Sequence, residues 1–360
     1  MTEYQPHNIL VTGGAGFIGS NYVRHMLTTY SEVNIINLDK LTYAGSIDNL
    51  NDLPGKDRHH FVQGDICDRA LITKLLEQHQ IDSIVHFAAE SHVDRSISGP
   101  SEFIQTNVIG TFVLLEAARE YWQKANNLNS QKCRFHHIST DEVFGTLALT
   151  DPAFTESTAY APNSPYSASK ASSDHLVRAW HHTYGMPVTT SNCSNNYGPC
   201  QHAEKFIPTV IAACQQQKPI PIYGDGSNIR DWLYVEDHCF GIDAVVRRGR
   251  LGETYNIGGI NEWANIDICR LICELMDKQN PTGAPHRQLI SFVTDRPGHD
   301  WRYAINAEKI AREIGWQPRE TFETGIAKTV EAQCLQPTVT PTEHSINTVI
   351  PTERSDEGPP

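Results

Sequence analysis

The chain has 360 residues, of which 39% are hydrophobic and 20% charged, and this supply of apolar side chains excludes global disorder. Its length exceeds that of a single small domain and favours one large α/β domain with a smaller second lobe. Acidic side chains outnumber basic ones by 42 to 29, and the resulting net charge of −13 opposes binding to nucleic acid or to an anionic membrane.

The sequence indicates neither export nor metal binding. The first six residues include an acid and no apolar run, so we expect no signal peptide. No 18-residue apolar segment predicts a membrane span. The nine cysteines are scattered from Cys67 to Cys334 without zinc-site spacing. We therefore expect reduced thiols, a cytoplasmic protein and no metal.

Strand-like and helix-like runs alternate through the first half of the chain. Strand-like runs cover residues 8–12, 33–38, 60–62, 81–87 and 134–139. An amphipathic run through Tyr22 and Leu27 follows the first of them, and further helical patterns cover residues 69–78, 101–125 and 165–184. Strands separated by helical crossovers predict an α/β fold with a Rossmann-like, doubly wound parallel sheet.

The pattern changes after residue 191 to short strands, proline-bounded turns and separate helices at 206–216, 265–277 and 307–315. We interpret residues 1–191 mainly as the sheet domain and residues 192–335 mainly as a smaller substrate-binding lobe, with the chain able to cross between the two. Residues 336–360 are polar and proline-rich, so we expect a disordered tail.

A glycine-rich turn lies between the first strand and the first helix. Gly13, Gly16 and Gly19 have a spacing that lets backbone N–H groups and the helix N-terminus approach a pyrophosphate. Three glycines also occur in ordinary loops, but the flanking strand and helix favour a dinucleotide site. Asp39 ends the second strand, where a carboxylate can accept both ribose hydroxyls of NAD and repel the 2′-phosphate of NADP. An ordinary turn aspartate is the alternative.

Two further groups of residues are typical of reaction chemistry. Tyr166 and Lys170 are four residues apart in a helical stretch and share one face, and an ammonium beside a phenol is expected to lower the phenol pKa. Thr140, Asp141 and Glu142 close the fifth strand, where a doubly wound sheet places its chemistry. Neighbours in a strand point to opposite faces, so Asp141 and Glu142 share a pocket only if the chain turns there. Otherwise they are solvated loop acids.

Together these residues resemble the extended short-chain dehydrogenase/reductase family, and within it the dTDP-glucose 4,6-dehydratases. The resemblance covers residues 8–332 and includes long signatures at 13–19, 88–96, 139–145, 166–170, 192–199 and 295–300. The Asp-Glu pair after Thr140 is its most specific element, since sugar epimerases of the family lack it. Phe144 departs from the family, which usually has Tyr there.

The resemblance implies a binding site for NAD and one for a nucleotide sugar, dTDP-glucose. The residues it places against NAD are Gly13, Gly16, Phe17, Ile18, Gly19, Asp39, Lys40, Leu41, Thr42, Asp65, Ile66, Phe87, Ala88, Ala89, Glu90, Ser91, Thr106, Tyr166, Lys170 and Asn196. The residues it places against the nucleotide sugar are Ser91, Thr140, Asn195, Lys205, Phe206, Ile207, Pro208, Thr209, Val210, Pro221, Ile222, Tyr223, Arg230, Asn265, Asp295, Arg296, Pro297, Gly298 and His299.

The catalytic residues are then expected to be Thr140, Asp141, Glu142, Tyr166 and Lys170, in a lyase of deoxysugar biosynthesis. The resemblance also implies a homodimer formed through the helices at 101–125 and 165–184. Two alternatives stay open: a 4,6-dehydratase or C4 epimerase acting on another nucleotide sugar, and a non-catalytic NAD-binding regulator.

Overall fold

The computed structural model describes residues 3–124, 132–281, 283–295 and 299–335. Its centre is a seven-stranded sheet in the order β10-β6-β5-β4-β1-β2-β3, in which every neighbouring pair is parallel. The strands are β1 (Asn8–Thr12), β2 (Asn34–Asp39), β3 (His59–Gln63), β4 (Ser83–His86), β5 (Arg134–Thr140), β6 (Val188–Cys193) and β10 (Thr254–Ile257).

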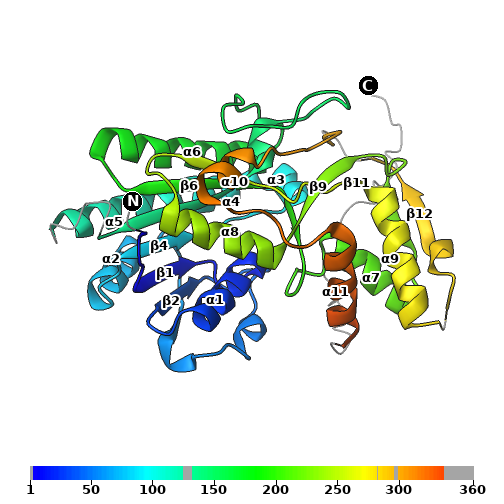
Figure 1. Ribbon diagram of the computed structural model, residues 1–360, viewed down its shortest axis with the longest axis horizontal. Helices are drawn as coiled ribbons and strands as arrows, with labels where there is room; N and C mark the ends of the chain where they lie inside the picture. The colour runs from blue at the N-terminus through cyan, green and yellow to red at the C-terminus, as the bar shows by residue number, and fades with distance from the viewer. Residues whose placement is uncertain (1–2, 125–131, 282, 296–298, 336–360) are drawn as a thin grey trace, which may run out of the picture.

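Helices cover both faces of this sheet, as Figure 1 shows. One face carries α1 (Phe17–Thr29), α8 (Val235–Arg248) and α10 (Glu308–Ile314), and the other α2 (Arg69–Gln78), α5 (Thr111–Lys124) and α6 (Pro165–Tyr184). Successive residues of β1 enter opposite cores, Ile9 and Val11 the first and Leu10 the second. This alternation explains why the strand is apolar throughout. The prediction of a doubly wound parallel sheet is confirmed.

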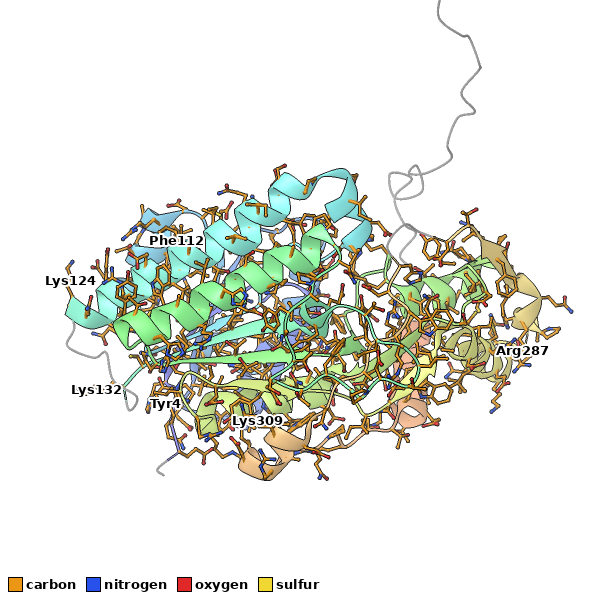
Figure 2. All side chains as sticks on the ribbon, turned by 90° about the horizontal axis from the view of Figure 1, so that it is seen from above. Tyr4, Phe112, Lys124, Lys132, Arg287 and Lys309 are labelled. Carbon is orange, nitrogen blue, oxygen red and sulfur yellow. The ribbon has the colours of Figure 1, made fainter. Side chains whose placement is uncertain are left out.

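The helical run that precedes β5 is longer and less regular than the sequence predicted. It begins with α3 (Val93–Ser98) and α4 (Pro100–Phe103), continues as a π-helix, η3 (Ile104–Gly110), and ends as α5. Figure 2 shows α5 and α6 side by side along the outside of the sheet domain.

The smaller lobe lies beyond the carboxyl ends of the strands. It contains a three-stranded sheet of β11 (Glu262–Ala264), β9 (Ile229–Tyr234) and β7 (Asn195–Tyr197), and a parallel pair of β12 (Ile290–Val293) and β8 (Ile220–Tyr223). Around them pack α7 (Phe206–Gln216), α9 (Asn265–Gln279) and α11 (Phe322–Leu335), with their own apolar core. Short 3₁₀ turns complete the chain: η1 (Ile47–Leu50), η2 (Lys56–Arg58), η4 (Asp141–Phe144) and η5 (His286–Leu289).

Two strands of the large sheet, β6 and β10, were not predicted. β6 reads Val-Thr-Thr-Ser-Asn-Cys and is buried along its whole length, because its hydroxyls pair with polar groups of β5. Thr189 and Ser191, for example, hydrogen-bond the two ring nitrogens of His136. β10 then returns from the lobe to pair with β6. In the described ranges no helix is long and apolar enough to cross a membrane, and the predicted tail 336–360 lies outside them.

Candidate active site

A cavity of about 600 Å³ lies between the carboxyl ends of the large sheet and the smaller lobe. Its walls come from the turns after β1, β2, β4 and β5, from α6, and from α7, β8 and β9 of the lobe. β1 lies between β4 and β2, so the strand order reverses at β1. Ligands of doubly wound sheets bind at this switch point, beyond the carboxyl ends of the strands.

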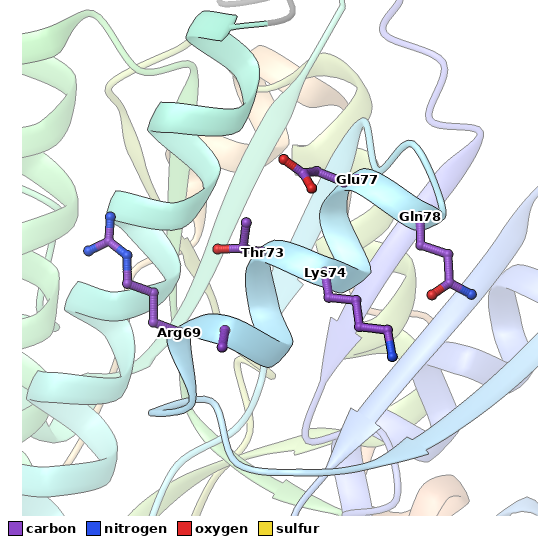
Figure 3. Close-up of a pocket in the computed structure, with 6 residues that line it drawn as sticks. Arg69, Thr73, Lys74, Glu77 and Gln78 are labelled. Carbon is purple, nitrogen blue, oxygen red and sulfur yellow. The ribbon is translucent and has the colours of Figure 1, made fainter.

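A second depression, of about 860 Å³, lies over the outer surface of α2. Figure 3 shows its lining, which comes from this one helix: Arg69, Ala70, Thr73, Lys74, Glu77 and Gln78. It contains none of the predicted site residues and is far more open than the first, so we assign the site to the 600 Å³ cavity.

The glycine turn has the shape that a diphosphate needs. Gly13 has φ +74°, and a Cβ there would lie 2.6 Å from the Ala88 backbone nitrogen; a Cβ on Gly19 would lie 2.2 Å from the Gly13 carbonyl oxygen. α1 begins at Phe17 without a side-chain cap and without an acid in its first turn. The backbone N–H groups of its first three residues have no acceptor within the helix and point to where an anion would bind.

Asp39 lies at the end of β2 and lines the same cavity. Its two carboxylate oxygens accept hydrogen bonds from the Ala15 N–H, at 2.9 Å, and the Leu41 N–H, at 2.8 Å. These bonds fix the carboxylate beside the glycine turn, where an adenosine ribose would lie if a dinucleotide were bound. Lys40 forms an ion pair of 2.8 Å with Asp65 at the adjacent rim.

The cavity wall also contains buried polar atoms that have no hydrogen-bond partner within the described protein. They are His92 Nδ1, Asn195 Oδ1, Gln201 Oε1, Glu204 Oε1 and Trp232 Nε1. A buried polar group without a partner costs about 1–3 kcal/mol. Because these atoms are buried in the ligand-free site, their side chains must turn toward a nucleotide or its sugar before they can pair with it.

Tyr166 and Lys170 lie on the first turns of α6, which a capping box between Ser164 and Ser167 starts. Both side chains line the cavity, and each is less than a tenth exposed. The Lys170 ammonium donates a 2.8 Å hydrogen bond to the Ile138 carbonyl of β5. The two predicted residues are therefore brought together on one helix face.

The predicted pKa of Tyr166 was wrong in direction. Burial raises its pKa well above the ordinary value, and the negative charge of Glu142 raises it further, while a hydrogen bond with the Thr140 hydroxyl lowers it. Lys170 directs its ammonium to a carbonyl, and burial lowers the pKa of Lys170 itself. Without ligands Tyr166 is thus a neutral phenol, and a cationic group of a bound ligand would oppose this shift.

Asp141 and Glu142 occupy the turn that the geometric argument required. The 3₁₀ turn η4 begins at Asp141, and Thr140 caps it by accepting a 3.3 Å hydrogen bond from the Glu142 N–H. Gly145, with φ +92°, ends it. The turn directs Glu142 into the cavity wall, whereas Asp141 lies behind the wall and is 1% exposed.

The surroundings of Asp141 favour its protonated form. Burial raises its pKa well above the ordinary value, and the charges of Glu142 and Asp231 raise it further. Its Oδ1 accepts a 3.4 Å hydrogen bond from the Thr140 hydroxyl, and its Oδ2 is buried without a partner in the described chain. A proton donor therefore stands next to Glu142.

Cations and aromatic rings line the lobe side of the cavity. Lys205 Nζ donates to the Ser91 carbonyl at 3.3 Å. The Arg230 guanidinium donates to the Asp300 carbonyl at 2.9 Å and lies over the Tyr303 ring, 4.4 Å from its centroid. Tyr223 and His299 meet edge to face. This side can bind a diphosphate and a flat base.

Most predicted contact residues line the cavity, but several do not. Ile207, Pro208 and Val210 are buried because α7 presents that face to the lobe core. Leu41 contributes its backbone N–H to Asp39, and Asp295 is exposed and pairs with His299, which lines the cavity. These five contacts with NAD or the nucleotide sugar stay predictions. Arg296, Pro297 and Gly298 lie outside the described residues.

Sequence reasoning missed other residues that line the cavity: Leu38, Ala44, Gly45, Gly64, His92, Val93, Asp94, Ile138, Ser139, Cys193, Ser194, Gln201, His202, Glu204, Trp232 and Val293. His92 and Asp94 belong to the recognised signature 88–96, so their place in it was a usable signal. Gln201, His202 and Glu204 connect the signature at 192–199 to Lys205. Trp232 had no sequence signal beyond its proximity to Arg230.

Comparisons with known proteins agree with this geometry. A family model described as GDP-mannose 4,6 dehydratase matches residues 10–329. The dTDP-glucose 4,6-dehydratase of Salmonella typhimurium is 57% identical over 331 residues, which cover 90% of this chain and 91% of that protein. The crystal structure of DesIV, a dTDP-glucose 4,6-dehydratase from Streptomyces venezuelae with NAD bound, is 44% identical, covers 91% and 97% of the two chains, and has a TM-score of 0.83.

Epimerases are similar in fold but more distant in sequence. The UDP-glucose 4-epimerase of Thermotoga maritima is 26% identical, covers 91% and 98% of the two chains, and has a TM-score of 0.79. The dehydratase resemblance predicted from the sequence is therefore confirmed, and the chain belongs to the family of nucleotide-sugar 4,6-dehydratases that the matching model describes.

Proposed function

We propose that the protein is an NAD-dependent lyase that converts dTDP-glucose to dTDP-4-keto-6-deoxyglucose. The single observation that carries this proposal is the pair formed by buried Asp141, whose pKa is raised, and cavity-lining Glu142. Oxidation of a hydroxyl by NAD needs only Tyr166 and Lys170 among these side chains, whereas loss of water also needs an acid and a base. Relatives that are 57% identical and named for this reaction support it.

The glycine turn, the N-terminus of α1 and Asp39 would hold NAD, which accepts a hydride from the substrate and later returns it. Asp39 favours NAD over NADP, because its carboxylate would repel a 2′-phosphate. Lys205 and Arg230 would neutralise the diphosphate of the substrate, together with Arg296 as the family resemblance implies. Tyr223 and His299 would contact the base.

The order of the chemistry follows from acidity. The C5 hydrogen of a hexose is too weakly acidic to remove, and hydroxide is a poor leaving group from C6. A ketone at C4 places the C5 hydrogen α to a carbonyl and the C6 hydroxyl β to it. Oxidation at C4 must therefore come first, elimination of water second and reduction at C6 last.

Each catalytic residue then has one role. With its ligands bound, Tyr166 would act as a phenolate that the Lys170 ammonium stabilises. It takes the C4 hydroxyl proton and becomes a neutral phenol, while Thr140 orients the C4 oxygen. Glu142 removes the C5 proton and later a proton returns to C5. Asp141 protonates the departing C6 hydroxyl, a role that its raised pKa favours. Because Asp141 lies behind the wall, a small movement of η4 or a bridging water must bring its proton to the substrate.

We further propose a homodimer in the cytoplasm. Ile104, Ile109 and Phe112 on the π-helix and α5, and Tyr184 at the end of α6, are large apolar residues that are 38–49% exposed. Phe112 lies on the outer side of the two long helices in Figure 2. Such a patch favours pairing with a second copy. All nine cysteines, each within the described ranges, are free thiols, which suits a reducing compartment.

Mass spectrometry of the products from a panel of nucleoside diphosphate hexoses tests this function. The purified protein should release a product one water lighter from dTDP-glucose, and Tyr166→Phe, prepared identically, should not. A product of unchanged mass would support the C4 epimerase alternative. Preferred dehydration of a uridine, cytidine or guanosine diphosphate sugar would identify that sugar as the substrate. If none of the hexoses in the panel is turned over, the result would support a non-catalytic NAD-binding protein.

A further inference from the structure

A buried carboxylate that the mechanism above does not use lies one helical turn beyond Lys170. Asp174 belongs to α6 and is 5% exposed. Residues four apart share a helix face, so Asp174 and Lys170 both face β5, against which α6 packs. β5 ends at Thr140, the residue that caps the catalytic turn.

Three groups donate hydrogen bonds to the Asp174 carboxylate. Oδ2 accepts from the Ser139 hydroxyl at 2.7 Å and from the Tyr160 hydroxyl at 2.9 Å, and Oδ1 accepts from His137 Nε2 at 3.1 Å. Ser139 immediately precedes Thr140 on β5, whereas Tyr160 lies in the segment that leads into α6. Asp174 thus ties both segments to the helix that carries Tyr166 and Lys170.

The three donors are neutral at pH 7. Burial lowers the pKa of His137 to about 4, and burial also lowers the pKa of His86 on β4, whose ring lies 5.4 Å from that of His137. Burial raises the pKa of Tyr160. Because an ionised carboxylate only accepts hydrogen bonds, the His137 proton lies on Nε2.

Lys170 is therefore the cation that balances Asp174. Burial alone would raise the pKa of Asp174, but hydrogen bonding with His137 and Ser139 and the charge of Lys170 lower it, so the carboxyl is ionised. The same charge acts in return: burial lowers the pKa of Lys170, and Asp174 raises it back in part, as does Cys193 on β6.

We propose that Asp174 is a positioning residue, whose carboxylate anchors the end of β5 beside Thr140 and supplies the negative charge that keeps Lys170 an ammonium. The inference rests on the proposed function, since it assigns Asp174 to the oxidation step in which Lys170 supports Tyr166. Without this charge Lys170, buried between α6, β5 and β6, loses its proton at a lower pH.

The test compares Asp174→Asn, which removes the charge but keeps the shape, with Asp174→Glu, which keeps the charge. For Asp174→Asn we expect an unchanged KM for dTDP-glucose, kcat lower by about 10²-fold, and an alkaline limb of the kcat profile shifted down by about one pH unit or more. Asp174→Glu should restore the alkaline limb.

Asp243→Asn is the matched control. Asp243 is also a helical carboxylate, 6% exposed, and accepts hydrogen bonds from Tyr30 and Arg247, but it lies on α8 at the other face of the sheet. Its loss should lower the melting temperature without moving the alkaline limb.

Turnover of dTDP-glucose by the wild type separates the two proposals. If the wild type does not turn over dTDP-glucose, the proposed function is contradicted, and the Asp174 variants are then compared on whichever nucleoside diphosphate hexose the wild type does convert. When the wild type is active, two results for Asp174→Asn overturn the inference. One is a wild-type kcat, and the other is a kcat that is lower at every pH while the alkaline limb stays in place. If Asp174→Asn does not fold, Asp174→Glu decides: a lower kcat with the wild-type limb supports the inference, and a wild-type kcat or a lowered limb overturns it.

Discussion

Replacing Asp141 with Asn separates catalysis from stability more cleanly than any other change in the site. Its surroundings favour the protonated carboxyl, and Asn copies the shape and neutral charge of that form while removing the transferable proton. Loss of a general acid costs about 10²- to 10⁴-fold in the step that needs it, or roughly 3–5 kcal/mol in the barrier to water loss. Oxidation at C4 should continue.

Whereas Asp141→Asn should slow the loss of water, it should increase the stability of the fold as the pH rises. An acid whose pKa is raised on folding stabilises the fold fully below its unfolded pKa of about 4 and loses that contribution as the pH rises toward its folded pKa. Each pKa unit corresponds to about 1.4 kcal/mol. The difference in unfolding free energy between Asp141→Asn and wild type should therefore grow in favour of the variant from pH 4 to pH 7. Subtracting the difference measured at pH 4 removes any effect of the amide that does not depend on pH.

Rapid-mixing absorbance and urea unfolding measure these two effects. With substrate, Asp141→Asn should show a burst of reduced nicotinamide absorbance and little dehydrated product. Glu142→Gln should show the same block, since the C5 proton stays in place. Elimination at the wild-type rate would refute the acid role of Asp141, and a stability difference that does not change with pH would refute its burial-driven protonation.

The remaining predictions concern the base, the cofactor and the assembly. Tyr166→Phe should lower the rate of C4 oxidation by about 10²- to 10⁴-fold, measured in a single turnover; an unchanged rate would exclude Tyr166 as the base. Asp39→Ala should reduce the preference for NAD over NADP in binding titrations, and an unchanged ratio would place the ribose contact elsewhere. Light scattering should show that Phe112→Asp converts a dimer into a monomer, because the substitution buries a charge in the proposed interface. If the variant is still a dimer, the dimer interface lies on another surface.

Much of the large sheet could be predicted because its strands carry simple signals. The predicted run 134–139 differs from the observed β5, Arg134–Thr140, by one residue, and the predicted helix 165–184 coincides with α6. These segments are bounded by turn residues and by a cap. β6 could not be found by hydropathy, because Thr189 and Ser191 are buried through hydrogen bonds with a histidine on the neighbouring strand.

The candidate site was predictable in its chain positions but not in its charges. The spacing of Tyr166 and Lys170 fixed their shared helix face. The pKa of Tyr166 depends instead on how deeply it is buried and on Glu142, which is 24 residues away in sequence and adjacent in space. Likewise, Asp141 and Glu142 are neighbours in sequence, but only the turn η4 shows that one lies behind the cavity wall and the other in it.

Asp141 and Asp174 show that burial alone does not set the charge of a carboxyl. Both are nearly inaccessible. Burial and two carboxylate neighbours raise the pKa of Asp141, which has one hydroxyl partner. Asp174 has three donors and a lysine, which lower its pKa despite burial, so it is ionised. Elimination needs a proton donor and oxidation needs an ammonium. The two carboxyls meet these opposite needs because hydrogen-bond donors and a cation surround Asp174, whereas burial and neighbouring carboxylates dominate around Asp141.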